Sequence, residues 1–171
     1  MWFSHFIVLF ALVTGFELLA KEPLLATRAP AKIELHDQFG TNHVLRFPCT
    51  NTIFLTVADR KSSGQVKEWV SAIKKKCQKE VMICGIANIE GAPGFLHRSI
   101  RKKFEESFKY PVMMDWTGEI SRELGVDPGV ANILIVDREG KIHGRFKGEA
   151  TEASVKQAAA LLAEASQQEQ K

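Results

Sequence analysis

The stretch NTIFLTVADRKSSGQVKEWVSAI, residues 51–73, changes its apolar pattern half-way along. Its first part, residues 52–57, is short, almost wholly apolar and rich in β-branched side chains, which is typical of a strand buried on both faces of a sheet. Farther on, Val66, Trp69, Val70 and Ile73 recur with the spacing of one helix face. The stretch therefore predicts a strand, a sharp turn and a helix whose N-terminus points out of a sheet edge.

The turn between this strand and helix is the candidate site. We expect Ser62 to cap the helix while Gln65 reaches back to the Ser62 N–H, the arrangement called a capping box. Because the first N–H groups and the dipole of a helix favour negative charge, Arg60 and Lys61 beside them could help to hold a carboxylate, phosphate or sulfate. The alternative is that both cations face solvent while Asp59 and Ser62 cap the helix.

The chain of 171 residues has 45% apolar and 25% charged residues, as expected for one folded domain. Residues 6–16 form an apolar run too short to span a bilayer, which indicates a signal peptide over residues 1–20 and an exported protein, periplasmic or secreted. Since no Lys or Arg precedes the run, an uncleaved membrane anchor remains the alternative. Cleavage is expected after Ala20, and a second small-x-small site at residues 29–31 leaves residues 21–31 as either a linker or part of a longer leader.

The charge of the chain excludes some partners. Its formal net charge is +3, which is too mild for a nucleic-acid-binding protein without a recognisable binding module. Membrane contact is expected only through the N-terminal segment, and we expect no cofactor. The partner is therefore an unknown protein or a small anionic ligand.

The remaining patterns predict a domain over residues 32–165 and a polar tail over residues 166–171. A β-hairpin is expected at residues 32–47, a strand at 81–87, a helix at 96–108 and a short strand at 111–115. A brief helix, a second hairpin over residues 132–146 and a terminal helix from Thr151 follow. Because one strand-helix-strand unit implies parallel strands, the expected class is α/β.

This order of elements resembles the thioredoxin-like fold of the redoxin branch. The segments 112–126 and 135–142 look like the strand-Asp-x-x-Gly-helix-Gly-Val and final hairpin segments of that family. The resemblance implies a three-layer α/β/α sandwich with a central mixed sheet and an N-terminal β-hairpin. Its active members carry Cys-x-x-Cys, or one peroxidatic cysteine, in the turn after the central strand, because a thiolate at a helix N-terminus has a lowered pKa.

Two parts of that redox site are missing from the sequence. Residues 61–64, which match the dithiol positions, read Lys-Ser-Ser-Gly, and Ala131 stands where the family places a cis-proline. In these features the chain is similar to exported YtfJ-type redoxin-like proteins, which also carry small and polar residues in place of the dithiol. The predicted ligand-binding or partner-binding residues are Asp59, Arg60, Lys61, Ser62, Ser63 and Ala131.

The three cysteines do not match a metal site or a C-x-x-C motif. Cys49 precedes the central strand and Cys77 ends the helix that runs back beside it, so a disulfide between them is geometrically reasonable. Cys84, in the middle of an apolar strand, is expected to be a buried and unreactive thiol. His36 and His43 could face each other across the first hairpin, but two ligands are too few, and we interpret them as surface residues without a metal.

The sequence therefore predicts a non-catalytic binding module. Its surface is expected to combine the turn at residues 59–65 with the loops at residues 88–94 and 127–131. One alternative is an enzyme, a thiol oxidoreductase or peroxidase that uses one of the three cysteines in an unorthodox way. The other is a small-anion binder at the turn.

Overall fold

The computed structural model describes residues 26–77 and 81–168. The predicted signal peptide, residues 1–20, and the end of the predicted polar tail lie outside the described residues. Within the described residues, twelve elements follow one another from the N-terminal hairpin to the terminal helix, in the predicted order apart from a short 3₁₀ turn before the second helix.

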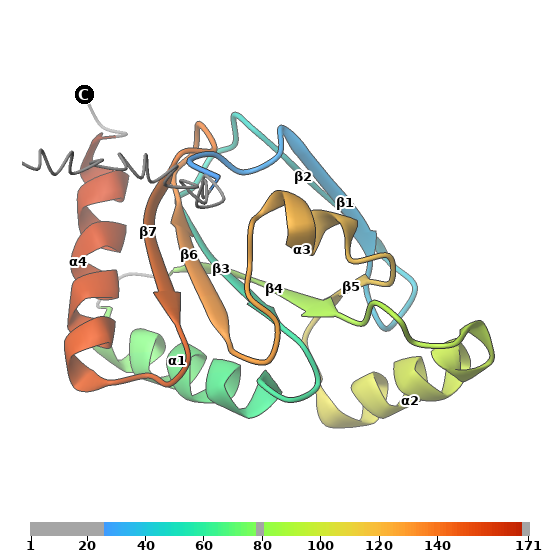
Figure 1. The fold of residues 1–171 in the computed structure, drawn as a ribbon. Coiled ribbons are helices and arrows are strands. Elements are labelled where there is room, and N and C mark those ends of the chain that lie inside the picture. Colours follow the sequence, from blue (N-terminus) through green and yellow to red (C-terminus); the bar gives the residue numbers. More distant parts are fainter. Residues whose placement is uncertain (1–25, 78–80, 169–171) are drawn as a thin grey trace, which may run out of the picture.

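A five-stranded mixed sheet forms the centre of the molecule, and a separate two-stranded hairpin lies beside it (Figure 1). The strand order in the sheet is β5-β4-β3-β6-β7, with β3 parallel to β4 and antiparallel to β6. The hairpin strands are β1 (Lys32–His36) and β2 (Asn42–Arg46). The sheet strands are β3 (Ile53–Ala58), β4 (Met82–Asn88), β5 (Met113–Asp115), β6 (Asn132–Val136) and β7 (Ile142–Lys147).

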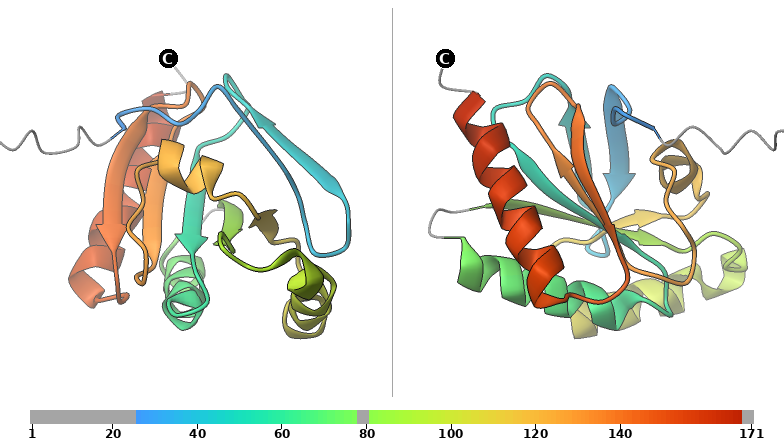
Figure 2. Two further views of the ribbon diagram at one scale, coloured as in Figure 1. Left: turned by 45° about the vertical axis from the view of Figure 1, so that its right-hand side comes forward. Right: turned by 60° about the vertical axis from the view of Figure 1, so that its left-hand side comes forward.

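The helices cover this sheet on two sides. They are α1 (Ser63–Lys76), η1 (Gly94–Leu96), α2 (His97–Ser107), α3 (Glu119–Glu123) and α4 (Glu152–Gln168). Figure 2 shows α1 and α4 on one side of the sheet, and α3 with the β1–β2 hairpin on the other. Because α4 continues to Gln168, residues 166–168 are helical, although the sequence suggested a polar tail there.

The alternation of side chains along β3 divides the apolar interior into two cores. Ile53, Leu55 and Val57 face the core under the hairpin and α3, which we call the hairpin-side core. Phe54 faces a second core with Trp69 of α1 and residues of α4, which we call the helix-side core. Since β3 is buried on both faces, its almost continuous apolar run is explained, as predicted.

The segment before the hairpin is attached to the sheet. Thr27 accepts a backbone hydrogen bond from Ile142 at 2.9 Å, and Ala29 donates one to Gly140 at 2.8 Å. Arg145 also donates from its guanidinium to the Ala26 carbonyl. Residues 26–29 therefore extend the pairing at the start of β7, inside the range that the sequence left open as linker or leader.

A candidate binding surface at the carboxyl end of the central strand

The turn after β3 is organised by Asp59. Its Oδ1 accepts hydrogen bonds from the N–H groups of Lys61 at 2.9 Å and Ser62 at 3.0 Å, and from the Ser62 hydroxyl at 2.9 Å. The Ser62 side chain makes no capping bond to the helix. The predicted capping box is therefore wrong, because the Asp59 carboxylate takes the Ser62 N–H and Gln65 is engaged elsewhere.

The second oxygen of Asp59 reaches the loop before β6. Asp59 Oδ2 accepts a hydrogen bond from the N–H of Gly129 at 2.7 Å. Partial burial alone raises the pKa of Asp59, but the hydrogen bonds from Ser62, Gly129 and Lys61 together outweigh it and leave the pKa below its usual value. Asp59 is therefore held as a carboxylate between the start of α1 and the facing loop.

This carboxylate bears directly on the predicted anion site. Asp59 already occupies the N–H groups of Lys61 and Ser62, two of those that an external anion at this turn would use, and its own negative charge opposes a second anion there. Arg60 and Lys61 are exposed, and Ser63 is exposed with its hydroxyl 3.3 Å from the Arg60 carbonyl. The protein's own carboxylate thus occupies the place where the sequence suggested a ligand, with the two cations pointing into solvent.

Gln65 makes the second connection across the site. Its Oε1 accepts a hydrogen bond from the N–H of Ala131 at 2.9 Å, and Ala131 is fully buried. The carbonyl of Ala131 accepts from the N–H of Gly148 at 2.8 Å, so both backbone groups of this residue are satisfied inside the domain. A proline at position 131 would have no N–H, so the hydrogen bond to Gln65 exists only because alanine stands there.

Asn132 fixes the shape of the same loop. The buried side-chain amide donates to the carbonyls of Asp127 at 2.8 Å and Val130 at 3.0 Å, and its oxygen accepts from the Asp127 N–H at 2.9 Å. The Asp127 carboxylate forms an ion pair with Lys147 on the neighbouring strand. Residues 127–131 are therefore fixed by hydrogen bonds to Asn132 of β6 and by an ion pair to Lys147 of β7.

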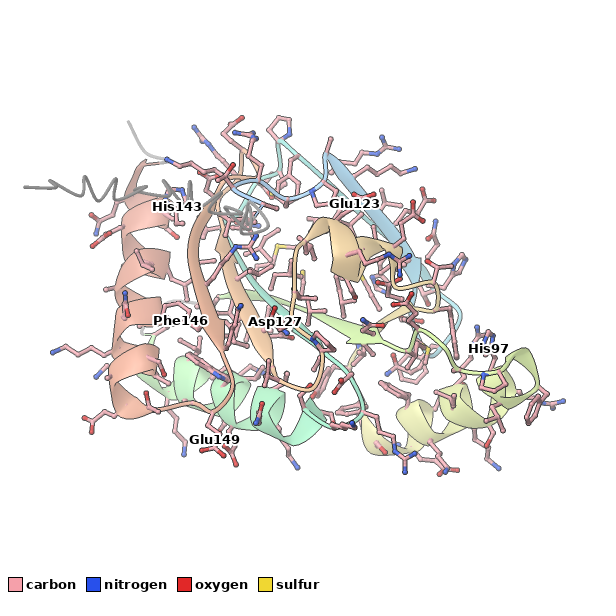
Figure 3. The ribbon with its side chains drawn as sticks, viewed as in Figure 1. His97, Glu123, Asp127, His143, Phe146 and Glu149 are labelled. Atoms are coloured by element: carbon pink, nitrogen blue, oxygen red, sulfur yellow. The ribbon has the colours of Figure 1, made fainter. Side chains whose placement is uncertain are left out.

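The structure brings together parts of the three segments that the sequence assigned to the binding surface. Asp59, Asn88 and Asp127 line one cavity of about 10 Å³, which holds at most a single water molecule. Figure 3 shows Asp127 at this junction, and His97 beyond it at the start of α2. The His97 ring stacks on Trp116 with centroids 3.9 Å apart, and its Nε2 lies 3.0 Å from the carbonyl of Ala92, in the 88–94 segment. The cavity at which the three segments meet is therefore too small for a small-molecule ligand.

The cysteines do not pair as the sequence suggested. All three lie in the described part of the chain and are free. Cys49 packs against the hairpin-side core and Cys77 against the helix-side core, so the sheet lies between them. The expected Cys49–Cys77 disulfide is therefore absent. Cys84 is half-buried, and not fully buried as the sequence suggested. Burial, followed by the charge of Cys49, raises the pKa of Cys84 to about 11, so little of it is thiolate at neutral pH.

The histidines of the first hairpin cannot share a ligand in the suggested way. In the strand register His43 lies opposite Leu35 while His36 lies opposite Asn42, which places the two imidazoles on opposite faces. His43 Nε2 is instead 2.8 Å from Asp37 Oδ2. Within residues 26–77 and 81–168, no group of three or more His, Cys, Asp or Glu side chains is arranged to hold a metal ion.

The Asp37–His43 contact belongs to a pattern that reasoning from the sequence missed. Asp37 Oδ1 accepts from the N–H groups two and four residues later, at 2.8 and 2.9 Å. Asp137 does the same at 2.9 and 2.8 Å, and its Oδ2 is 2.7 Å from His143 Nε2. Both hairpins are thus closed by the same Asp-x-x-Gly-x-x-His sequence, with Gly40 at φ +84° and Gly140 at φ +82°.

Solved structures resemble this architecture closely enough to decide the fold. The exposed lipoprotein thioredoxin Etrx1 of Streptococcus pneumoniae superposes with a TM-score of 0.58 at 16% identity, covering 76% of this chain and 98% of that one. The fold is thioredoxin-like. No family model matches the chain, and no curated protein resembles it significantly.

Two further thioredoxin-like structures agree with this assignment. A secreted thiol-disulfide isomerase of Corynebacterium glutamicum gives a TM-score of 0.54 at 16% identity, covering 79% of this chain and 85% of that one. A thioredoxin family thiol:disulfide interchange protein of Chlorobium tepidum gives 0.55 at 18% identity, covering 80% and 97%. The predicted mixed sheet with flanking helices and an N-terminal hairpin is confirmed, and identities this low carry the fold alone.

The segment that the sequence matched to the dithiol, residues 61–64, lies in the turn after β3 and the first turn of α1. Ser62 is the N-cap of α1 and is fully buried, and Gln65, just beyond the segment, reaches the loop before β6, as Asp59 does. Lys61 and Gly64, the ends of the segment matched from sequence, are both exposed. No residue from 59 to 65 is a cysteine, so this turn carries no thiol whichever of its residues are matched to the dithiol.

Within residues 26–77 and 81–168, no helix combines the length and the apolar character that are needed to cross a bilayer.

Proposed function

We propose that this thioredoxin-like domain is a non-catalytic binding module, with a protein partner recognised on the surface formed by residues 59–65, 88–94 and 127–131. The observation that carries the proposal is the hydrogen bond from the Ala131 N–H to Gln65 Oε1. It joins Ala131, which stands at the position matched to the cis-proline, to Gln65, the residue after the segment matched to the dithiol. The replacement of the proline is therefore coupled to a polar side chain of the turn.

The physical argument concerns a buried amide. Replacing a proline by Ala131 adds an N–H inside the domain, and an unpaired buried N–H costs about 1–3 kcal/mol. A cysteine at position 65 offers only a weak acceptor, whereas the glutamine oxygen satisfies this N–H at 2.9 Å. The site is thus rebuilt as a rigid polar surface in which backbone groups of the turn and the loop are bonded to each other.

The remaining cysteines give little support to the enzyme alternative. A thiol with a pKa of about 11, as at Cys84, is almost entirely protonated at neutral pH, and the thiolate is the nucleophile. Burial also raises the pKa of Cys77. Neither residue lies in the turn that carries redox chemistry in relatives of this fold.

We also propose export of the domain to the periplasm or beyond. The proposal rests on the apolar run at residues 6–16 and on the resemblance to exported YtfJ-type redoxin-like proteins. An uncleaved N-terminal anchor would deliver the domain to the same side of the membrane. N-terminal sequencing of the protein from its source cells tests this, since a chain that still begins at Met1 in a soluble cytoplasmic fraction contradicts export.

The first experiment measures thiol chemistry. The protein is assayed for dithiol-dependent insulin reduction and for peroxide consumption, with a thioredoxin as the positive control. We expect rates equal to those of the buffer blank. Turnover that disappears in the Cys84→Ser, Cys49→Ser or Cys77→Ser variant would establish the enzyme alternative and overturn the proposal.

The second experiment measures binding at the surface itself. A photo-reactive amino acid is placed at Lys61 or at Asp127 and, as the matched control, at the exposed Lys156 on α4. In the cells that produce the protein, we expect a discrete cross-linked species from the two surface positions and none from position 156. Equal cross-linking from all three positions would contradict a partner at this surface.

The anion alternative is tested separately by calorimetry with phosphate and sulfate. Because Asp59 occupies the N–H groups of the turn, we expect no binding heat from the wild type. Binding by the wild type that is lost when Arg60 and Lys61 are changed to Ala would favour the anion binder instead.

A further inference from the structure

Two of the three cysteines lie on the same side of the central sheet. Cys49 and Cys84 both pack against the hairpin-side core, together with Ile53 and Leu55 of β3. Cys77 packs against the helix-side core and is separated from them by the sheet. A partner for Cys49 must therefore be sought across β3 and β4, and not on α1.

The chain before β3 holds Cys49 against the start of the sheet. Its N–H donates to the Arg138 carbonyl at 2.8 Å, and its Sγ donates to the Asn51 carbonyl at 3.3 Å. The side-chain amide of Asn51 in turn lies 4.0 Å from Met82 Sδ, at the first residue of β4. The Cys49 thiol is thus anchored beside the end of the sheet where β4 begins.

Cys84 is two residues farther along β4. It pairs in register with Leu55, and like Leu55 it points into the hairpin-side core. The strand rise is about 3.3 Å per residue, so the step from Met82 to Cys84 adds only about 7 Å along the strand. Both residues are half-buried, which keeps a path to small reagents in solution.

The electrostatics of the two thiols agree with this placement. Burial is the main cause of the raised pKa of Cys84, and the negative charge of Cys49 raises it further. Such an effect needs two groups that are close together in a poorly solvated region. Cys77 shows the effect of burial alone.

We propose that Cys49 and Cys84 form a disulfide when the protein meets an oxidising thiol–disulfide buffer, and that Cys77 stays a free thiol. The bond would join the chain entering β3 to the neighbouring strand β4. It lies at the amino end of β3, whereas the turn discussed above follows its carboxyl end. The proposal is thus independent of whether that turn binds a partner.

The oxidant is a small-molecule disulfide such as oxidised glutathione. The Cys49 thiolate attacks one glutathione sulfur, the S–S bond of glutathione breaks, and one glutathione leaves as a thiolate that takes up a proton. The Cys84 thiol then loses its proton to solvent and attacks Cys49 Sγ, which releases the second glutathione. Two protein thiols lose two electrons and two protons, and one glutathione disulfide becomes two glutathione molecules.

The test uses the full chain, equilibrated with oxidised glutathione, denatured and alkylated with iodoacetamide. We expect mass spectrometry to find one alkylated cysteine, Cys77, and a linked pair of peptides containing Cys49 and Cys84. After reduction, all three cysteines are alkylated. Three alkylated cysteines in the oxidised sample, a linked peptide that contains Cys77, or a disulfide-linked dimer would each overturn the proposal.

Cysteine variants and the pH dependence of the closure rate provide two further tests of the same disulfide. Cys77→Ser should still form the linked pair, whereas Cys84→Ser should form none and leave Cys49 carrying one glutathione, with Cys77 alkylated. If Cys84→Ser does not fold, Cys49→Ser in the loop before β3 provides the same comparison. Because Cys84 is a high-pKa thiol, we expect closure of the mixed disulfide to quicken about tenfold for each pH unit between about 7 and 9. A closure rate independent of pH would contradict Cys84 as the second partner.

Discussion

Replacing Asp59 by Ala tests whether the turn and the facing loop are held together by one carboxylate. Asp59 accepts two backbone N–H bonds and one hydroxyl bond at the start of α1, and a fourth bond from Gly129 at 2.7 Å. For the bonds that close the turn before α1 we take about 1 kcal/mol, by analogy with a helix-capping bond. Loss of a charge-assisted bond across the loop costs about 1.5 kcal/mol. We therefore expect Asp59→Ala to lower the free energy of unfolding by about 2.5 kcal/mol.

The measurement is urea unfolding followed by circular dichroism at pH 7, and Asp127→Ala is the matched control. Asp127 lies in the facing loop, but its ion pair with Lys147 joins side chains that are 51% and 43% exposed. Exposed ion pairs contribute about 0–1 kcal/mol. An Asp59→Ala variant that is no less stable than Asp127→Ala would refute the role of Asp59 in joining the turn to the facing loop.

The effect of Asp59→Ala on stability should also change with pH, in a direction that the pKa of Asp59 determines. The pKa of Asp59 in the folded protein lies below its usual value, so its contribution to stability is complete above the unfolded pKa and is lost as the pH falls through the folded pKa. The difference in stability between the wild type and Asp59→Ala should therefore be constant near neutral pH and shrink below about pH 4. A difference that grows on acidification would contradict a stabilising carboxylate.

Three further predictions concern single contacts, and all are measured as free energies of unfolding in urea. Gln65→Ala should cost about 1–3 kcal/mol because it leaves a buried N–H unpaired, whereas Gln65→Glu keeps the acceptor and should cost less; equal losses would contradict this role. Asp37→Asn should destabilise the protein more than Asp137→Asn, since their side chains are 2% and 16% exposed, and the reverse order would contradict burial as the cause. A chain that begins at residue 32 should be less stable than one that begins at residue 21, because it lacks the backbone bonds to the start of β7; equal stability would show that these bonds contribute nothing.

The sequence predicted the fold well because the signal for each main element is local. The apolar run of β3 and the spacing of Trp69 and Ile73 on α1 are set by burial on a fixed period, and the structure buries both residues completely. The second hairpin was predicted from a glycine in its turn, which has the positive φ that such a turn requires. Elements defined by contacts within a few residues could therefore be placed without the structure.

The candidate site was predicted only in part because its decisive contacts connect distant segments. Gln65 was expected to bond to Ser62, a neighbour in the sequence. Its side-chain oxygen instead accepts a hydrogen bond from Ala131, which is 66 residues away. Local rules favour the nearer partner, and only the packed loop shows that a buried N–H needs the same oxygen. The prediction of a Cys49–Cys77 disulfide was wrong for a related reason. Counting residues along the strand and the helix shows which end of the sheet each thiol is near, but not which face of the sheet it lies on.

The two Asp-x-x-Gly-x-x-His turns have a consequence for how this chain can be altered. One turn closes an isolated two-stranded hairpin and the other closes an edge of the main sheet, yet each connects the same backbone atoms to the same side-chain oxygens. The bonds that shape each turn therefore lie within seven residues, although the surroundings differ: Gln38 bonds to the chain before β5, whereas Arg138 accepts from Cys49. One short sequence pattern thus builds the same turn in two different settings of one domain.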